Sequence, residues 1–148
     1  MTYALFKTLH IAGAILLLGN VTVTGFWAIF LYRQHERIDF RPVARAIMWA
    51  DYLFTVLGGA LLTWSGIMLA VQGGYRIRET PWIMHGIIAL ALSTAIWGLV
   101  LLPCQWRMER LEPGDTAGLR RVFVRWNAFG WVSTALLFYG LWAMVGKR

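Results

Sequence analysis

Charged residues are scarce in this sequence: they make up 14% of 148 residues, whereas 59% are hydrophobic. A soluble domain of this size with so few charges would expose too much apolar surface to water. A soluble four-helix bundle would also repeat charged residues along the outer face of each helix. Here the charges cluster between apolar stretches. The composition therefore excludes an ordinary water-soluble bundle.

Cysteine is almost absent as well. The single Cys104 excludes an internal disulfide and a metal cluster built from cysteines. The sequence also lacks a Ser-His-Asp set, paired carboxylates, a phosphate-binding loop and a zinc motif. Although the net charge is +7, there is no basic stripe on a soluble face, so nucleic acid is not an expected partner.

Four long apolar runs make up most of the chain, at residues 3–32, 47–72, 81–102 and 122–145. A helix rises about 1.5 Å per residue, so about 20 residues cross the roughly 30 Å hydrocarbon core of a bilayer. We expect an all-α polytopic membrane protein, one domain over residues 1–148 that forms an antiparallel bundle of four transmembrane helices. The first run is too long for a signal-peptide core and has no clear cleavage site, so we expect it in the mature protein.

The basic residues predict the orientation of this bundle. Nine of the 14 lie at the two long connections: Arg33, Arg37, Arg41, Arg45, Arg107, Arg110, Arg120, Arg121 and Arg125. The other five lie at the opposite side: Lys7, Arg76, Arg78, Lys147 and Arg148. Positive charge favours the cytoplasmic side. We therefore expect a protein of the bacterial inner membrane with both termini on the outer, periplasmic side.

Small and weakly polar residues predict which face of each helix turns inward, because lipid supplies no hydrophobic drive between helices. At 100° per residue, one arc of the first helix gathers nearly all of its small and polar residues. The arc comprises His10, Gly13, Ala14, Leu17, Asn20, Val21 and Thr24. The corresponding arc of the last helix comprises Asn127, Gly130, Trp131, Thr134, Phe138 and Leu141.

Two histidines lie within the predicted spans, both on inward arcs. His10 is near the outer end of the first helix, and His85 is four residues into the third. These helices run in the same direction, so both imidazoles should lie at a similar depth. Placing an ionisable group inside a membrane span costs free energy, so such a group suggests a function. Two imidazoles that face each other across the bundle would suit the axial positions of one b-type haem.

The surroundings of the histidines fit that hypothesis. A flat porphyrin needs small neighbours, which Gly13, Ala14, Gly86 and Ala89 would provide. Its propionates need cations at the outer surface, where Lys7, Arg76 and Arg78 are available. We therefore predict His10 and His85 as metal ligands, and the three cations as cofactor-binding residues, in a protein that serves electron transfer or a membrane redox step.

Three alternatives remain open. Each histidine could instead be neutral and form a hydrogen bond with a carbonyl or hydroxyl group of a neighbouring helix. Copper is a second possibility, since thioethers and imidazole suit Cu(I), although the wheel turns Met68, Met84 and Met144 away from the inward arcs. The chain could also be a non-catalytic subunit of a larger membrane complex or a homo-oligomer. The sequence reveals neither a substrate nor a reaction, so enzyme activity is undecided.

Asp51 is the one acid that comes close to lying inside an apolar run. The runs place it at the start of the second helix, level with Arg121 and Arg125 of the fourth. We expect a structural ion pair there in preference to a proton relay.

Short motifs along nearly the whole chain resemble a predicted bacterial integral-membrane family of unknown function. They are FKTLHIAGA at residues 6–14, ADYLFT at 50–55, the Ser65-Gly66 step, Thr80-Pro81-Trp82, and the stretch from Trp97 through LPCQW at 102–106. The first motif also resembles a loose superfamily that contains CopD-type copper-resistance proteins and HemJ-type protoporphyrinogen oxidases.

This resemblance implies a four-helix bundle with a functional histidine in the first helix, which corresponds to His10. HemJ-like relatives imply a b-type haem on that histidine, and CopD-like relatives imply copper handling at the outer face. The third helix has no lysine to match the HemJ pattern, which puts protoporphyrinogen oxidation in doubt, though His85 could replace the missing ligand. The longer body of CopD is also missing.

Overall fold

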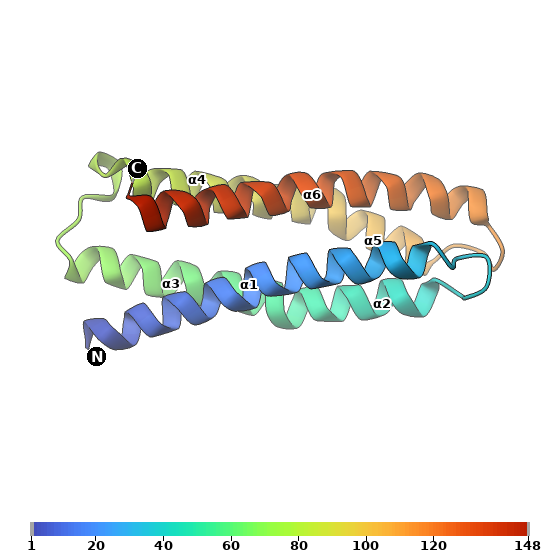
Figure 1. The fold of residues 1–148 in the computed structure, drawn as a ribbon, viewed down its shortest axis with the longest axis horizontal. Coiled ribbons are helices and arrows are strands. Elements are labelled where there is room, and N and C mark those ends of the chain that lie inside the picture. Colours follow the sequence, from blue (N-terminus) through green and yellow to red (C-terminus); the bar gives the residue numbers. More distant parts are fainter. Residues whose placement is uncertain (1, 148) are drawn as a thin grey trace.

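Four long helices pack antiparallel in the computed structural model, which describes residues 2–147 (Figure 1). The elements are α1 (Tyr3–Tyr32), α2 (Arg41–Ala50), the π-helical turn η1 (Asp51–Val56), α3 (Leu57–Gln72), the 3₁₀ turn η2 (Ile77–Glu79), α4 (Pro81–Ile96), the π-helical turn η3 (Trp97–Leu101), α5 (Leu102–Glu109) and α6 (Thr116–Gly146). The continuous helices Tyr3–Tyr32, Arg41–Gln72, Pro81–Glu109 and Thr116–Gly146 are each long and apolar enough to span a bilayer. The predicted all-α membrane fold is confirmed.

Three of the helices extend beyond their apolar runs, and all three extend at the same end of the molecule. The second begins at Arg41 instead of residue 47, the third continues to Glu109 instead of 102, and the fourth begins at Thr116 instead of 122. A hydropathy run stops at the first cluster of arginines, but the helix itself can continue into the polar headgroup region. Asp51 consequently lies ten residues inside its helix, roughly 15 Å from its start.

The four helices form two hairpins. In the first hairpin α1 lies along η1 and α3, and in the second α4 lies along α6. We call the end with both termini and the 73–80 connection the terminal end, and the end with the 33–40 and 110–115 connections the loop end. Contacts between the hairpins join α2 to α5 and α1 to α6. Figure 1 shows the hairpins close together at the loop end and apart at the terminal end.

The buried apolar cluster lies at the loop end. It comprises Ala28, Phe40, Ala44, Ile47, Leu101, Cys104, Met108, Leu119, Phe123 and Trp126. Aromatic rings from three segments meet within it: Phe123 stacks on Tyr32, with ring centroids 3.9 Å apart, and meets Phe40 edge to face at 5.6 Å. Such contacts favour one arrangement of the helices, because dispersion attraction and the preferred geometry of ring pairs do not depend on the exclusion of water.

Glycines let the helices within a hairpin approach closely. A Cβ atom at Gly13 would lie 2.7 Å from the Leu62 nitrogen, and one at Gly58 would lie 2.8 Å from the Leu17 nitrogen. In the second hairpin a Cβ atom at Gly140 would lie 3.1 Å from that of Ala89. These are the small-residue contacts that drive helix association in lipid.

The predicted inward face is confirmed for the first helix, whose Gly13 and Leu17 are buried. For the last helix the prediction is partly wrong: Phe138 and Leu141 are exposed, while Gly140 and Ala143 are buried. The reason is that α6 has two inward faces. One carries Gly140 and packs on α4, whereas only the part of the predicted face at residues 127–134 lines a space between the hairpins.

Aspartates order the two connections at the loop end. Asp115 caps α6 by accepting a hydrogen bond from the Gly118 amide at 2.8 Å. Asp39 accepts hydrogen bonds from the backbone amide and the guanidinium of Arg41, at 2.7–3.0 Å. These hydrogen bonds hold the pKa of Asp39 below its ordinary value.

Candidate functional site

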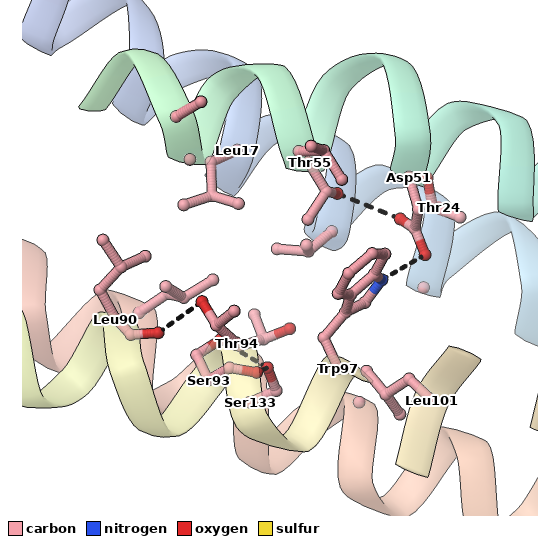
Figure 2. A pocket seen from close by; sticks show the side chains of 18 of the residues that line it. Leu17, Thr24, Asp51, Thr55, Leu90, Ser93, Thr94, Trp97, Leu101 and Ser133 are labelled. Atoms are coloured by element: carbon pink, nitrogen blue, oxygen red, sulfur yellow. Dashed lines mark hydrogen bonds between the residues drawn. The ribbon is translucent and has the colours of Figure 1, made fainter. Parts of the chain in front are cut away.

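A cavity of about 570 Å³ lies between the two hairpins. Its walls come from α1, η1 and α3 on one side and from α4, η3 and α6 on the other, with Gln105 of α5 near its loop-end limit. Figure 2 shows side chains from both hairpins pointing into this space. The cavity is therefore lined by both hairpins.

Asp51 lies at the cavity wall and is only 5% exposed. Its Oδ1 atom accepts hydrogen bonds from the Asn20 amide at 3.0 Å and the Thr55 hydroxyl at 3.1 Å. Its Oδ2 atom accepts from the Trp97 indole at 3.2 Å and the Gln105 amide at 2.7 Å. Four donors thus fill the four acceptor positions of the carboxylate.

These donors are all electrically neutral, and the network continues through neutral groups. Asn20 also donates to Thr55 at 2.9 Å and accepts from Thr24 at 3.1 Å. The predicted ion pair of Asp51 with Arg121 or Arg125 is wrong. In residues 2–147 the ion pairs join Arg41 to Asp39, Arg45 to Glu109 and Arg76 to Glu79. Arg121 and Arg125 are exposed near the loop end, whereas Asp51 lies deep in its helix.

Two π-helical turns bring Asp51 and Trp97 together. Asp51 is the first residue of η1 and Trp97 the first residue of η3, and Figure 2 shows the Trp97 indole crossing from one hairpin to the other. Pro103 explains η3, because its ring removes a backbone N–H and clashes with the carbonyl one turn earlier. Turns of this kind are rare and concentrate at functional sites.

Hydroxyl groups line the wall opposite Asp51. Ser93 of α4 and Ser133 of α6 are both 5% exposed, and their Oγ atoms lie 2.6 Å apart. Thr94 donates to the carbonyl of Leu90 at 2.8 Å. These hydroxyl groups bond within the second hairpin, and its side chains that bond to Asp51 are Trp97 and Gln105.

Two buried polar atoms at the cavity have no hydrogen-bond partner: Oε1 of Gln105 and Nε1 of Trp126. Gln105 is completely buried and Trp126 is 6% exposed. Unpartnered buried groups cost roughly 1–3 kcal/mol each, so they require an explanation. One atom is an acceptor and the other a donor, and both belong to residues that line the same space.

His10 lies in the α1–α3 interface. Its Nδ1–H donates to the Leu62 carbonyl at 2.9 Å and lies 3.3 Å from the Ser65 hydroxyl. Gly66 makes room for the ring, since a Cβ atom there would lie 2.9 Å from His10 Cε1. His10 thus bonds to groups of a neighbouring helix, which is one of the alternatives that the sequence left open. The arrangement also leaves Nε2 as the unprotonated nitrogen of a neutral ring.

His85 lies in the other hairpin, beside Tyr139 of α6, with ring centroids 6.0 Å apart. Its Nδ1 atom is buried without a partner. Neither His85 nor His10 lines the cavity, and two of the small residues predicted beside a porphyrin are occupied: Gly13 contacts α3, and Gly86 contacts Met144. The two imidazoles remain a predicted ligand pair that no contact in the structure joins.

The three predicted cofactor-binding cations lie at the terminal end. Lys7 is exposed on α1, Arg78 is exposed in η2, and Arg76 pairs with Glu79 at 2.9 Å. In the part of the chain that the structure describes, no three residues of the His, Cys, Asp and Glu types group as a metal site. The three cations stay predicted cofactor-binding residues.

Reasoning from the sequence missed most of the Asp51 network. One indication was available: Asp51 is the acid embedded among apolar residues, and such residues usually have a function. The contributions of Asn20 and Gln105 were not predictable, because they depend on how deep each helix lies in the bundle. The position of Trp97 depends on a π-helical turn that hydropathy does not reveal.

Comparison with known proteins identifies the family of this chain. Residues 4–148 match the family described as "Predicted integral membrane protein (DUF2269)". No curated protein and no solved structure matches the chain. The wider resemblance to CopD and HemJ proteins stays a prediction. With nearly its whole length matched, this multi-pass membrane chain belongs to the DUF2269 family of predicted integral membrane proteins.

Proposed function

We propose that this protein binds a lipophilic small molecule, which enters from the bilayer between the two hairpins and places its polar end at Asp51. The observation that carries the proposal is the cavity of about 570 Å³ with one embedded carboxylate on its wall. Ligand pockets are typically about 300–1,000 Å³, mostly apolar, with a few polar groups that orient the ligand.

A route from the bilayer supports this proposal. Trp64, Ile67 and Trp131 line the cavity and are 44–46% exposed. Trp131 lies midway along α6 and therefore at membrane depth. A space bounded by such residues communicates with lipid, so an apolar molecule can reach it without crossing water.

The polar end of the cavity supplies orientation. Asp51, Gln105 and Trp97 meet near the loop-end limit of the cavity, whereas the rest of its wall is largely apolar. An amphiphilic molecule would therefore bind with its apolar part toward the terminal end. Binding is the activity that we propose, because the shape and lining of the cavity suit a ligand.

The proposal is tested by filling the cavity from both walls. Gly59 and Gly130 line the cavity on opposite hairpins, and an added Cβ atom meets nothing within 4 Å at either position. The test variant is the double substitution Gly59→Phe/Gly130→Phe. The matched control is Gly19→Phe/Gly98→Phe, at two equally unobstructed glycines outside the cavity.

Dodecanol in non-ionic detergent serves as the probe, and thermal unfolding as the measurement. A ligand at 100 times its Kd stabilises the folded state by about 2.7 kcal/mol, which raises Tm by roughly 5 °C or more. We expect this increase for the wild type and the control variant, and its loss for the cavity-filling variant. An equal increase in all three proteins would contradict the proposal.

We also propose that the loop end faces the cytoplasm, because nine of the 14 basic residues lie there. Fusions of a reporter that is active only in the periplasm to the C-terminus should be active. Fusions after residue 112 should be inactive, and the reverse pattern would overturn the orientation.

A bound haem remains a second proposal, favoured by the unpartnered Nδ1 of His85 and by the hydrogen bond of His10 Nδ1, which leaves Nε2 unprotonated. The two rings belong to different hairpins, so ligation would require the hairpins to close at the terminal end. A reduced-minus-oxidised spectrum of protein purified from haem-replete cells tests it. A colourless preparation, or an unchanged spectrum in His85→Ala, would defeat it, and copper retained by the wild type but lost in His10→Ala would favour copper instead.

A further inference from the structure

We infer that the molecule bound in the cavity carries a cationic nitrogen, whose counter-ion is the carboxylate of Asp51. This inference rests on the proposed function and specifies the chemical class of its ligand as a lipophilic amine. Three independent features of the cavity support it: its charge, its aromatic walls and the unpartnered acceptor beside Asp51.

The first feature is charge. Asp51 is the single ionisable carboxylate on the cavity wall, and among residues 2–147 no lysine, arginine or histidine lines this space. Its four hydrogen-bond donors are neutral, so they stabilise the ionised carboxylate without cancelling its charge. At low dielectric an uncompensated negative charge attracts a cation and repels an anion strongly. The site therefore favours amines over fatty acids.

The second feature is the aromatic lining. Four of the nine tryptophans of the chain border the cavity: Trp64, Trp97, Trp126 and Trp131. Indole faces attract cations, by about 2 kcal/mol or more where water is excluded. A carboxylate combined with several indoles is the composition that recognises ammonium groups, whereas neutral hydrocarbon would need only aliphatic walls.

The third feature is Oε1 of Gln105, the acceptor that has no partner. Gln105 already donates to Asp51 through Nε2, at 2.7 Å. A primary ammonium has three N–H donors, so it can donate to Oδ2 of Asp51 and to Oε1 of Gln105 together. Trp97 makes the longest of the four bonds to Asp51, at 3.2 Å, and Figure 2 shows its indole on the cavity side. Its N–H is the donor that an ammonium would displace.

Three probes of equal chain length test the inference: dodecylamine, dodecanol and dodecanoate at equal mole fractions in non-ionic detergent at pH 7. Affinity is obtained from the dependence of Tm on probe concentration. We expect dodecylamine to bind at least about tenfold more tightly than dodecanol, a ratio that corresponds to about 1.4 kcal/mol. Dodecanoate should bind most weakly. Equal affinities, or tightest binding of dodecanoate, would overturn the inference.

Substitution of the carboxylate provides the second measurement. Asp51→Asn should reduce the preference for amine over alcohol to about one and leave dodecanol affinity within about threefold of the wild type. Trp97→Phe, which frees one position on Oδ2, should preserve or increase the preference. An unchanged preference in Asp51→Asn would overturn the inference. If Asp51→Asn does not fold, the three-probe series on the wild type decides alone.

These outcomes separate the two proposals. If the three probes bind equally and the Gly59→Phe/Gly130→Phe variant abolishes binding of all three, the cavity binds ligands but not through charge, so only the inference fails. If filling the cavity changes no affinity, the proposed function itself fails.

Discussion

The two ends of the bundle are built on different principles. At the loop end the two hairpins share one core, in which Ala44 and Met108 are at most 1% exposed and aromatic rings stack. Toward the terminal end each hairpin packs within itself, through Gly13 and Gly58 in one and Gly140 in the other, and the space between the hairpins becomes a cavity. Figure 1 shows this divergence.

This contrast marks the boundary between the packed part of the bundle and the cavity. In lipid, apolar surface gains little by contact with another helix, so hairpins stay together only where shape or polar groups require it. The loop end supplies shape through its aromatic cluster. Asp51 lies at the boundary, where donors from both hairpins reach one carboxylate. Beyond it the cavity separates the hairpins, so this part of the bundle can admit a ligand.

The largest loss of stability is expected at Phe123 of α6, for which Phe138 of the same helix is the control. Phe123 is 4% exposed in the loop-end core, whereas Phe138 is 47% exposed. Phe123→Ala should lower the free energy of unfolding by about 3–5 kcal/mol, because it leaves a cavity among packed rings. Phe138→Ala should change it by less than about 0.5 kcal/mol. Unfolding in detergent measures both, and equal losses would remove the distinction between the two ends.

A smaller effect is expected at the close approach of α1 and α3. Gly13→Ala should destabilise by about 1–3 kcal/mol, since the new Cβ atom meets the backbone of Leu62. Gly19→Ala in the same helix meets nothing within 4 Å and should be neutral or stabilising by up to about 1 kcal/mol. If both alanines are tolerated alike, hairpin packing does not depend on backbone contact.

The bond between Ser93 and Ser133 should contribute less again. A double-mutant cycle with Ser93→Ala and Ser133→Ala isolates the pair, whose Oγ atoms lie 2.6 Å apart. Hydrogen bonds between membrane helices average about 0.6 kcal/mol and reach about 1.7 kcal/mol. We expect a coupling energy in that range. A coupling of zero would show that α4 and α6 are held by small-residue packing alone.

The smallest effect is expected for the ion pair between Arg45 and Glu109, which joins the hairpins at the loop-end surface at 2.7 Å. The Arg45 side chain is 64% exposed, so the pair should contribute roughly 0.2–1 kcal/mol and weaken with added salt. Unfolding of Arg45→Gln in low and high salt measures it. A loss above about 2 kcal/mol would mean that charge, and not the aromatic core, joins the hairpins.

The fold was predictable because the thickness of the bilayer fixes how long and how apolar each spanning helix must be. The first helix was predicted to the residue, since no arginines interrupt it. The starts of the second and fourth helices were wrong, because a helix continues past the point where its side chains become charged. That error placed Asp51 too close to the polar surface and suggested an arginine partner.

The site was less predictable than the fold. The inward arc of α1 correctly included Asn20 and Thr24, because small and polar residues in lipid nearly always face protein. A helical wheel assumes a constant 100° per residue, so it cannot anticipate the π-helical turns that aim Asp51 and Trp97 at each other. Nor does it give the relative depth of neighbouring helices, on which the partnership of Gln105 with Asp51 depends.

The position of a bound ligand is the most direct test of the proposed binding site. A photoactivatable diazirine analogue of dodecanol would be crosslinked to the protein in nanodiscs, with and without excess dodecanol, and the modified residues identified by mass spectrometry. We expect competition to remove labelling from both cavity walls, at residues 55–67 and 130–137, and to leave labelling around exposed Gly19 unchanged. Competed labelling that avoids these walls, or labelling that no dodecanol displaces, would contradict it.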